Sequence, residues 1–465
     1  MVSPTPQPLA LVWFRDDLRL TDNATLTWAA QHGHVVGLFI FEEIDAARPL
    51  GAAAAWWQRE SVRKLHADLA QRGVHLIIEH GDPREIVPRI AAELGATAVT
   101  WNRRYHLPFR DVDAELKRTL AGTCEVTSHP GYLLNEPWTV QTGSGTPFRV
   151  FTPYGKASQS MLIDAPPTPL PIPDLHGTGA TSAPPTFEEP FWAVETLAKH
   201  CHPGETQAQR RFRDFLDGLA DTSYKDSNDI PSVDATSGLS AHLRFGEISP
   251  AQTWAETAAF ADANHTVAAD AWAFLRQLLW RDFAWHRLYY IPNLATHNVR
   301  EQFNAFPWAW TDQATPGSTT RAFAHPKMVP NDPDEAQHLD ELALWQKGET
   351  GIPMVDAGMR ELWATGTMHN RVRMVVGSWL TKNLGIHWRH GEEWFWDTLV
   401  DADYASNPFN WQWVAGCGDD AAPYFRIFNP LLQEEKFDPQ GLYINQWVPE
   451  RHTPMYPEPM VDVKN

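Results

Sequence analysis

Short apolar runs alternate with amphipathic segments over the first third of the chain. The apolar runs have the length of buried strands, and the segments between them repeat apolar positions with a helical period. Strands are expected at Leu9–Phe14, Val35–Phe41, Val74–Glu79 and Ala96–Trp101, and helices at Ala52–Arg72 and Pro83–Leu94. Alternation of strands and helices is typical of a doubly wound parallel sheet. The sequence therefore predicts an α/β domain over residues 1–130.

Strand patterns vanish from about Glu205 onward, and helical periodicity takes their place. Ser249-Pro250 is a favourable N-cap and first-turn pair. An aromatic-rich helix is expected at Trp272–Tyr290, and Gly351–Leu384 reads as two helices separated near Gly366. The sequence thus predicts an all-helical domain over residues 205–465.

Two segments lack periodicity. Asp164–Pro185 is rich in Pro, Gly, Ser and Thr, so residues 131–204 are interpreted as an interdomain linker. Residues 309–339 are polar, carry several prolines and lie between aromatic helical stretches. Because a long structureless loop is unusual inside a compact domain, we interpret them as a surface insertion.

Composition narrows the classes of function. The 465 residues carry a net charge of −19, which argues against a general nucleic-acid binder but allows a local basic patch. The three cysteines have neither disulfide nor metal spacing, as expected of reduced thiols in a cytoplasmic protein. No apolar run is long enough for a signal peptide or membrane span. Many of the 22 tryptophans fall between Trp272 and Trp447, where packing explains most of them.

Two motifs could bind a polar ligand. The hydroxyls of Thr236–Ser240 precede a helical stretch and could hold phosphate, although on pattern alone an ordinary helix cap is the better explanation. Asn370 and Met374 share one helical face, with Arg373 beside them. They could line a cavity for an aromatic ligand, or form a solvated basic face.

A third motif combines two carboxylates with an amide. Asp401, Asp403 and Asn407 lead into Trp411 and Trp413. Two acids within a few residues could begin a metal loop, but no further ligands follow at metal spacing. The set also suits a ligand that has both hydrogen-bond donors and acceptors, and we expect no metal.

Longer motifs give the chain a family resemblance from about Leu9 to Val463. Val12–Arg19 with Asp22-Asn23 resembles the opening motif of the photolyase/cryptochrome family. Motifs that resemble its FAD domain follow in order at Thr236–Ser240, Trp280–Phe283, Gly351–Met359, Met368–Met374 and Trp411–Pro430. The chain is most similar to class I photolyases of cyclobutane pyrimidine dimers.

This resemblance implies an α/β antenna domain and a helical domain that holds FAD. The phosphates and ribose would be held by Tyr224, Thr236, Ser237, Leu239 and Ser240, and the flavin and adenine by Phe274, Arg281, Asn370, Arg373, Asp401 and Asp403. Asn407 would face flavin N5, where a neutral amide adds no second negative charge beside a reduced flavin. The antenna pigment would be 8-hydroxy-5-deazaflavin or methenyltetrahydrofolate.

The resemblance also implies a substrate site for damaged DNA. Trp280 and Trp413 would flank a dimer flipped out of the duplex. Gln277, Met374 and Asn370 would face the dimer, and Arg371 and Arg426 would contact phosphates. Electron donation from excited, reduced FAD would split the dimer. Trp411, Trp388 and Trp308, the last at the surface, would reduce the flavin in light, with Trp310 as an alternative end.

Three positions depart from the family pattern and leave alternatives open. Gln277 stands where a glutamate is usual, Asn228 where an arginine is common, and Thr367 where a tryptophan is usual. Glutamine also occurs at the first place in (6-4) photolyases and some cryptochromes. Against a (6-4) enzyme, Asn370 follows His369 where that branch has a second histidine. Against a sensory cryptochrome, no long extension follows the motifs. We expect a monomeric enzyme that repairs cyclobutane dimers.

Overall fold

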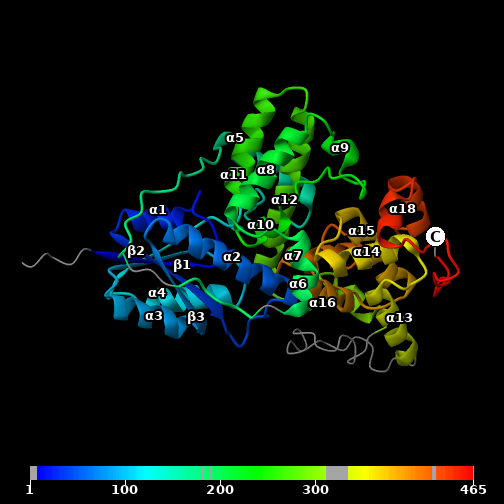
Figure 1. The fold of residues 1–465 in the computed structure, drawn as a ribbon, viewed down its shortest axis with the longest axis horizontal. Helices are drawn as coiled ribbons and strands as arrows, with labels where there is room; N and C mark the ends of the chain where they lie inside the picture. Colours follow the sequence, from blue (N-terminus) through cyan, green and yellow to red (C-terminus); the bar gives the residue numbers. More distant parts are fainter. Residues whose placement is uncertain (1–7, 180–182, 189, 310–333, 422–425, 464–465) are drawn as a thin grey trace, which may run out of the picture.

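The computed structural model describes residues 8–179, 183–188, 190–309, 334–421 and 426–463. A sheet flanked by helices forms one end of the molecule, and helices alone form the rest (Figure 1). This is the fold class expected from the sequence.

Five parallel strands form the sheet, in the order β3-β2-β1-β4-β5. Their bounds are β1 Leu9–Phe14, β2 His34–Glu42, β3 His75–Gly81, β4 Ala98–Asn102 and β5 Glu125–His129. The first four lie where the sequence predicted strands. The fifth was missed because it is a short edge strand whose residues are nowhere fully buried, so it lacks an apolar run.

Helices cover both faces of the sheet, as a doubly wound fold requires. Side chains of successive strand residues point to opposite faces. Ala10, Val12 and Phe14 therefore join one core, whereas Leu11 and Trp13 join the other. The first core is completed by α1 (Ala24–Ala30) and α2 (Ala52–Ala70), and the second by α3 (Pro83–Leu94) and α4 (Phe109–Thr119).

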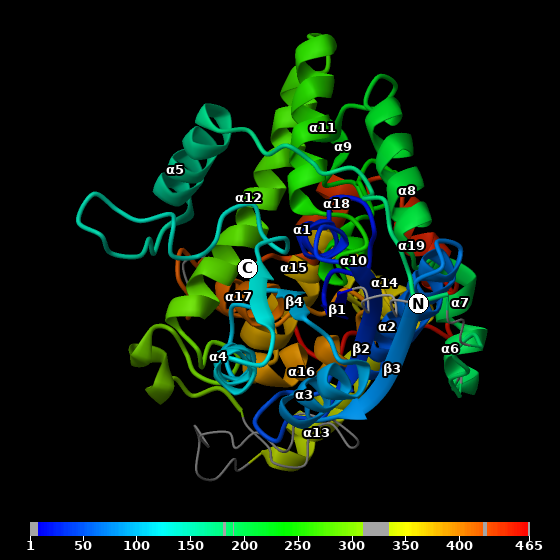
Figure 2. The ribbon, with the colours of Figure 1, turned by 90° about the vertical axis from the view of Figure 1, so that its left-hand side faces the viewer.

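The segment after the sheet combines a helix with extended chain. α5 (Phe151–Asp164) packs against the helical half, and residues 166–176 then run without helix or strand up to Gly177. That end is fixed to the sheet, because Gly177 forms a bridge with Val35. Figure 2 shows α5 standing beside α12, away from the sheet.

Helices make up the described part of the second half. Before residue 309 they are α6 Phe191–Glu195, α7 Leu197–His200, α8 Glu205–Gly218, α9 Tyr224–Ser227, α10 Ser240–Arg244, α11 Pro250–Ala263, α12 Ala268–Tyr290 and the 3-10 helix η1 Glu301–Ala305. After residue 333 they are α13 Glu335–Lys347, α14 Pro353–Thr365, α15 Asn370–Ser378, the π-helix η3 Trp379–Asn383, α16 Trp388–Thr398, α17 Ser406–Ala415, α18 Pro430–Phe437 and α19 Leu442–Trp447.

Two predicted helix boundaries in this half are confirmed, whereas α12 begins at Ala268, four residues before the predicted start at Trp272. Ser249 caps α11 by accepting a hydrogen bond from the backbone N–H of Gln252. Gly366 ends α14 with φ of 70°, in the left-handed region that glycine adopts without strain. The predicted insertion is shorter than expected at its far end, since α13 begins at Glu335. Most of residues 309–339, including Trp310, lies outside the described residues.

Every helix in the described ranges is too short or too polar to cross a lipid bilayer.

Candidate flavin and DNA-lesion site

A cavity of about 530 Å³ lies between α10 and α12 on one side and α15, α16 and α17 on the other. Its volume is in the range of cofactor and substrate sites. Fourteen of the predicted site residues line it: Ser237, Ser240, Phe274, Gln277, Trp280, Arg281, Asn370, Arg373, Met374, Asp401, Asp403, Asn407, Trp411 and Trp413. Folding therefore gathers residues from five separate motifs around one space.

The other predicted residues do not line the cavity. Tyr224 and Leu239 are buried in the adjoining core, and Thr236 lies in the loop that leads to the cavity wall. Of the predicted DNA contacts outside the cavity, Arg371 is ion-paired with Asp229. Arg426 is exposed, with its guanidinium over the Phe428 ring.

The Thr236–Ser240 loop is held from outside by Arg211. The guanidinium donates to the backbone oxygens of Thr236, at 2.7 Å, and Ser237, at 2.9 Å. Gly238 has φ of 62°, and a Cβ there would lie 2.9 Å from Nε of Arg211. Glycine is therefore required for this close approach. The carbonyls are fixed away from the cavity, while the Ser237 and Ser240 side chains line it.

Arg373 and Asp401 form an ion pair on the cavity wall. Nη2 of Arg373 lies 2.9 Å from Oδ2 of Asp401, and its Nε donates to the backbone oxygen of Met368. The Asp401 side chain is almost fully buried, whereas Arg373 is partly accessible. The pair offers a carboxylate acceptor and guanidinium donors to one polar ring edge.

Asp403 is held by four protein donors. Its Oδ1 accepts from the backbone N–H groups of Ala405 and Ser406, and its Oδ2 accepts from the Tyr132 hydroxyl and Trp285 Nε1. A carboxylate has about four acceptor positions, so these contacts saturate Asp403. Its main effect is therefore to fix the loop that follows Asp401 and leads into α17, the helix that carries Asn407.

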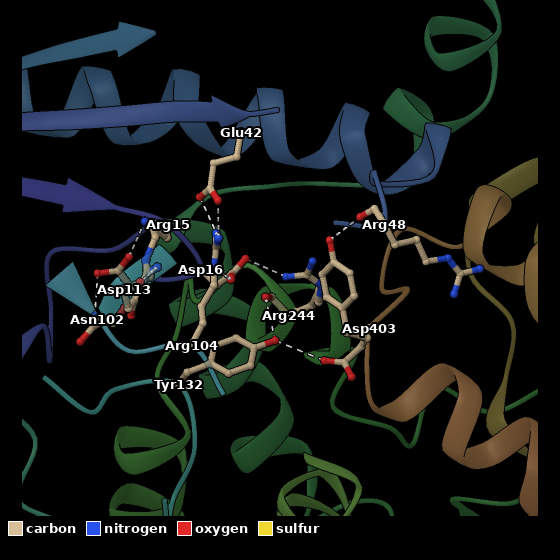
Figure 3. Close-up of polar contacts among 12 residues, drawn as sticks. Arg15, Asp16, Glu42, Arg48, Asn102, Arg104, Asp113, Tyr132, Arg244 and Asp403 are labelled. Atoms are coloured by element: carbon tan, nitrogen blue, oxygen red, sulfur yellow. Dashed lines mark hydrogen bonds and ion pairs between the residues drawn. The ribbon is translucent and has the colours of Figure 1, made fainter. Parts of the chain in front are cut away.

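The same loop is tied to the sheet by buried charges (Figure 3). Arg244 donates to the backbone oxygen of Ala402 and to Oδ1 of Asp16, which follows β1. Arg104 joins Asp16 to Glu42 with contacts of 2.7 Å to each. Burial raises the pKa of Asp16, but Arg104 and Arg244 outweigh it and hold that pKa below its usual range. Asp16 is thus ionised, and the ion pairs connect the two halves of the molecule.

Asn407 is oriented by Glu392. Its Nδ2 donates to the backbone oxygen of Glu392 at 3.1 Å and to Oε1 at 2.9 Å. Glu392 is fully buried, and Arg48 balances its charge through two contacts of 2.7 and 2.8 Å. Because both contacts are to acceptors, the amide nitrogen must face Glu392, which leaves the Asn407 carbonyl oxygen for a ligand in the cavity.

Two indole rings line the outer part of the cavity. Trp280 comes from α12 and Trp413 from α17, and Gln277 lies one helical turn before Trp280. None of the described residues that line the cavity is a histidine. His369 caps α15, since its Nδ1 accepts from the backbone N–H of Arg371, and burial lowers its pKa to about 4. It is therefore neutral, and it does not line the cavity.

The predicted electron-transfer tryptophans are all buried, which corrects one expectation. Trp411 lines the cavity, and Trp388 is fully buried in the same hydrophobic core, with Nε1 donating to Oδ1 of Asn298. Trp308 was predicted at the surface, but its side chain is 0% exposed. Its Nε1 donates to the backbone oxygen of Thr381, and its ring packs against Phe303 and Phe306. The rings of Trp308 and Trp388 both contact His387, at centroid distances of 5.3 and 5.5 Å.

Sequence reasoning missed the residues that support the site. Arg48, Arg244 and Glu392 lie outside the motifs that resemble ligand contacts, and each acts through a partner distant in the chain. Of these, only Glu392 carried a possible signal, as a charged residue within the aromatic run of α16.

Comparison with known proteins agrees with this geometry. Residues 10–174 match the family described as "DNA photolyase", and residues 274–455 match "FAD binding domain of DNA photolyase". The chain is 42% identical to the deoxyribodipyrimidine photo-lyase of Agrobacterium fabrum, over 95% of this chain and 87% of the relative. The chain belongs to the photolyase/cryptochrome family.

Two further relatives place it within that family. The crystal structure of a class III photolyase from Agrobacterium tumefaciens superposes with a TM-score of 0.87 at 39% identity, covering 99% of this chain and 96% of that one. Cryptochrome-2 of Arabidopsis thaliana is 33% identical over 95% of this chain and 70% of its own length. The sequence motifs had suggested class I photolyases, whereas this solved relative is described as class III.

Proposed function

We propose that this protein repairs cyclobutane pyrimidine dimers in DNA by light-driven electron transfer from FAD. The observation that supports this most strongly is that the candidate lesion contacts and the candidate flavin contacts line one cavity. Trp280, Trp413 and Gln277 form the first set, and Asp401 with Asn407, at the start of α17, belongs to the second. A flipped-out dimer and a flavin would then lie in contact.

The polar wall fits FAD. Ser237 and Ser240 would hold its phosphates through their hydroxyls and the backbone amides of the loop. The helix dipole would add little, since α10 has only five residues. Phe274 and the Arg373–Asp401 pair would hold the rings, and the Asn407 carbonyl oxygen would accept from flavin N5. When bound and fully reduced, FAD supplies the electron that splits the dimer.

The outer wall fits the lesion. Base stacking on an aromatic ring is worth about 1–3 kcal/mol, which offsets part of the cost of flipping. Trp280 and Trp413 would stack on the dimer, and Asn370, Met374 and Gln277 would contact its edges. Arg426 would meet a backbone phosphate. Arg371 would do so only in competition with Asp229, which weakens it as a contact.

The lining favours cyclobutane dimers over (6-4) photoproducts. A (6-4) enzyme is expected to use a histidine as proton donor beside the lesion. The described lining has none, and Asn370 occupies the place where one would be expected. His369 is held as a helix cap instead.

Light would also reduce the flavin through Trp411, Trp388 and Trp308. Burial of all three rings fits electron transfer through the protein, and Trp308 would need a further step to reach solvent. An antenna pigment, 8-hydroxy-5-deazaflavin or methenyltetrahydrofolate, would feed energy to FAD. Extracting the pigment and recording its absorption spectrum identifies it.

We further propose that the protein is a cytoplasmic monomer, divided into an antenna domain (1–130), a linker (131–204) and a FAD domain (205–465).

The function is tested by illuminating the purified protein with a dimer-containing oligonucleotide. Repair in blue light and none in the dark is expected, and Trp280→Ala should raise the Kd for that oligonucleotide about tenfold. FAD bound without repair in light would favour a cryptochrome-like sensor.

A further inference from the structure

The Trp280 ring is stacked on a residue from outside the helical half. Phe151, the first residue of α5, lies parallel to it, with ring centroids 3.5 Å apart and planes inclined by 9°. Phe151 is 2% exposed, whereas Trp280 is only partly buried and lines the cavity. One face of the indole is therefore covered by Phe151, while the residue still borders the cavity.

Phe151 is itself held in place. Its backbone N–H donates to Oδ2 of Asp420 at 3.0 Å. Three residues earlier, Phe148 donates its N–H to His286 and accepts from Arg287 at its carbonyl oxygen. His286 and Arg287 belong to α12, the helix that also carries Trp280. Phe151 and Trp280 are thus fixed to the same rigid frame.

Space for this stack is provided from within α5. Gly155 lies one turn after Phe151, and a Cβ at Gly155 would come within 3.2 Å of Cζ of the Phe151 ring. On α12, the Arg276 guanidinium also lies over the ring, 5.0 Å from its centroid. The phenyl group is therefore enclosed, so it cannot turn away from Trp280 without displacing these neighbours.

We propose that Phe151 is a positioning residue for lesion recognition, which holds the Trp280 indole ready to stack on a flipped-out base. This rests on the proposed function. Phe151, Trp280 and the lesion base would then form one continuous stack, with the indole between the phenyl ring and the dimer. Because the indole is held before binding, little rotamer freedom is lost when DNA arrives. Undamaged duplex inserts no base and gains nothing from the arrangement.

The test compares Phe151→Leu and Phe151→Met with the wild type and with Phe212→Leu. Phe212 is a fully buried residue of the same helical core that does not line the cavity, so it controls for lost packing. Met approximates the volume of Phe without its flat face, which keeps the protein folded. FAD content by absorption and Tm are measured for each protein.

Affinity is measured by fluorescence anisotropy with a dimer-containing and an undamaged oligonucleotide. Loss of the aromatic backing predicts a dimer Kd raised about twofold to tenfold in both Phe151 variants. The Kd for undamaged DNA, and the repair rate at saturating DNA, should stay as in the wild type. Phe212→Leu should lower Tm without changing the preference for dimer DNA.

If Phe151→Met binds FAD and prefers dimer DNA as strongly as the wild type does, the positioning role of Phe151 is overturned. A preference lost equally in Phe212→Leu would also overturn it, since general destabilisation would then explain the effect. If the wild type itself fails to prefer dimer DNA, the proposed function fails instead, so the two failures are distinguishable.

Discussion

Both amide hydrogens of Asn407 are directed at Glu392, one at its backbone oxygen and one at its carboxylate. Glu392 in turn is clamped by Arg48 from the loop after β2. A residue that would face the flavin is thus oriented by an ion pair that crosses between the two halves of the molecule. The orientation follows from hydrogen-bond chemistry, because a flipped amide would place two acceptors together.

Glu392→Leu is expected to destabilise the protein strongly. It leaves Arg48 as a largely buried charge without its partner and removes an acceptor from Asn407. Breaking a buried pair in this way costs about 3–5 kcal/mol. Urea denaturation measures the free energy of unfolding. The double variant Arg48→Met/Glu392→Leu should recover part of the loss, and equal losses in single and double variants would argue against the clamp.

Gly391→Ala is expected to disturb the flavin-side tryptophan. A Cβ at Gly391 would overlap the end of the Trp411 indole, so the ring must shift. Photoreduction of FAD should slow, although less than in Trp411→Phe, which should abolish it. Gly218→Ala in α8 is the matched control, since nothing lies within 4 Å of its added Cβ. Time-resolved absorption measures the rates, and unchanged photoreduction in both Trp411 and Gly391 variants would exclude this path.

The raised pKa of Asp282 predicts that the stability of the protein depends on pH. Burial raises its pKa to about 7, and Arg281 offsets this only in part. The folded state therefore retains a proton that the unfolded state releases near its ordinary pKa. Its contribution to stability is present at low pH and is lost as pH rises through about 7, by about 1 kcal/mol between pH 6 and 8.5. Asp282→Asn should remove that difference, measured as Tm at the two pH values. An Asn variant with the wild-type pH dependence would place the effect elsewhere.

Gln277→Glu is expected to tighten binding of cyclobutane dimers. The glutamine side chain is exposed on the cavity rim, so a carboxylate there would keep its charge. A charge-assisted hydrogen bond to a thymine N–H is about twice as strong as a neutral one. Titration with a dimer-containing oligonucleotide measures Kd. Gln277→Leu serves as the comparison, because leucine can form neither the charge-assisted nor the neutral hydrogen bond. Weaker binding by the Glu variant than by the wild type would show that Gln277 donates to the lesion instead.

Much of the fold follows from patterns within single segments. The alternation of apolar runs and amphipathic helices fixes the first four strands, and Ser249 and Gly366 mark helix ends by their own chemistry. The sequence analysis did not predict β5, because a short, half-exposed edge strand has no apolar run. Local patterning therefore predicts those elements that bury a face, and misses those that pair at an edge.

The site was predictable only in its ligand-facing part. Motif residues such as Asp401 and Trp413 line one cavity, as the resemblance implied. Arg48 and Arg244 could not be found, because their partners Glu392 and Asp16 are hundreds of positions away. Trp308 was misplaced for a related reason. Its burial depends on Thr381 and His387, which are far away in the chain and meet Trp308 only after folding.

The lesion that the protein repairs tests the account most directly. Equal amounts of a cyclobutane-dimer oligonucleotide and a (6-4) oligonucleotide are illuminated with blue light in the presence of the reduced wild-type protein, and restored bases are quantified by chromatography. We predict repair of the cyclobutane dimer alone, because Trp280 and Trp413 are placed to flank a dimer and none of the described residues that line the cavity is a histidine. Repair of the (6-4) product with none of the cyclobutane dimer would contradict it.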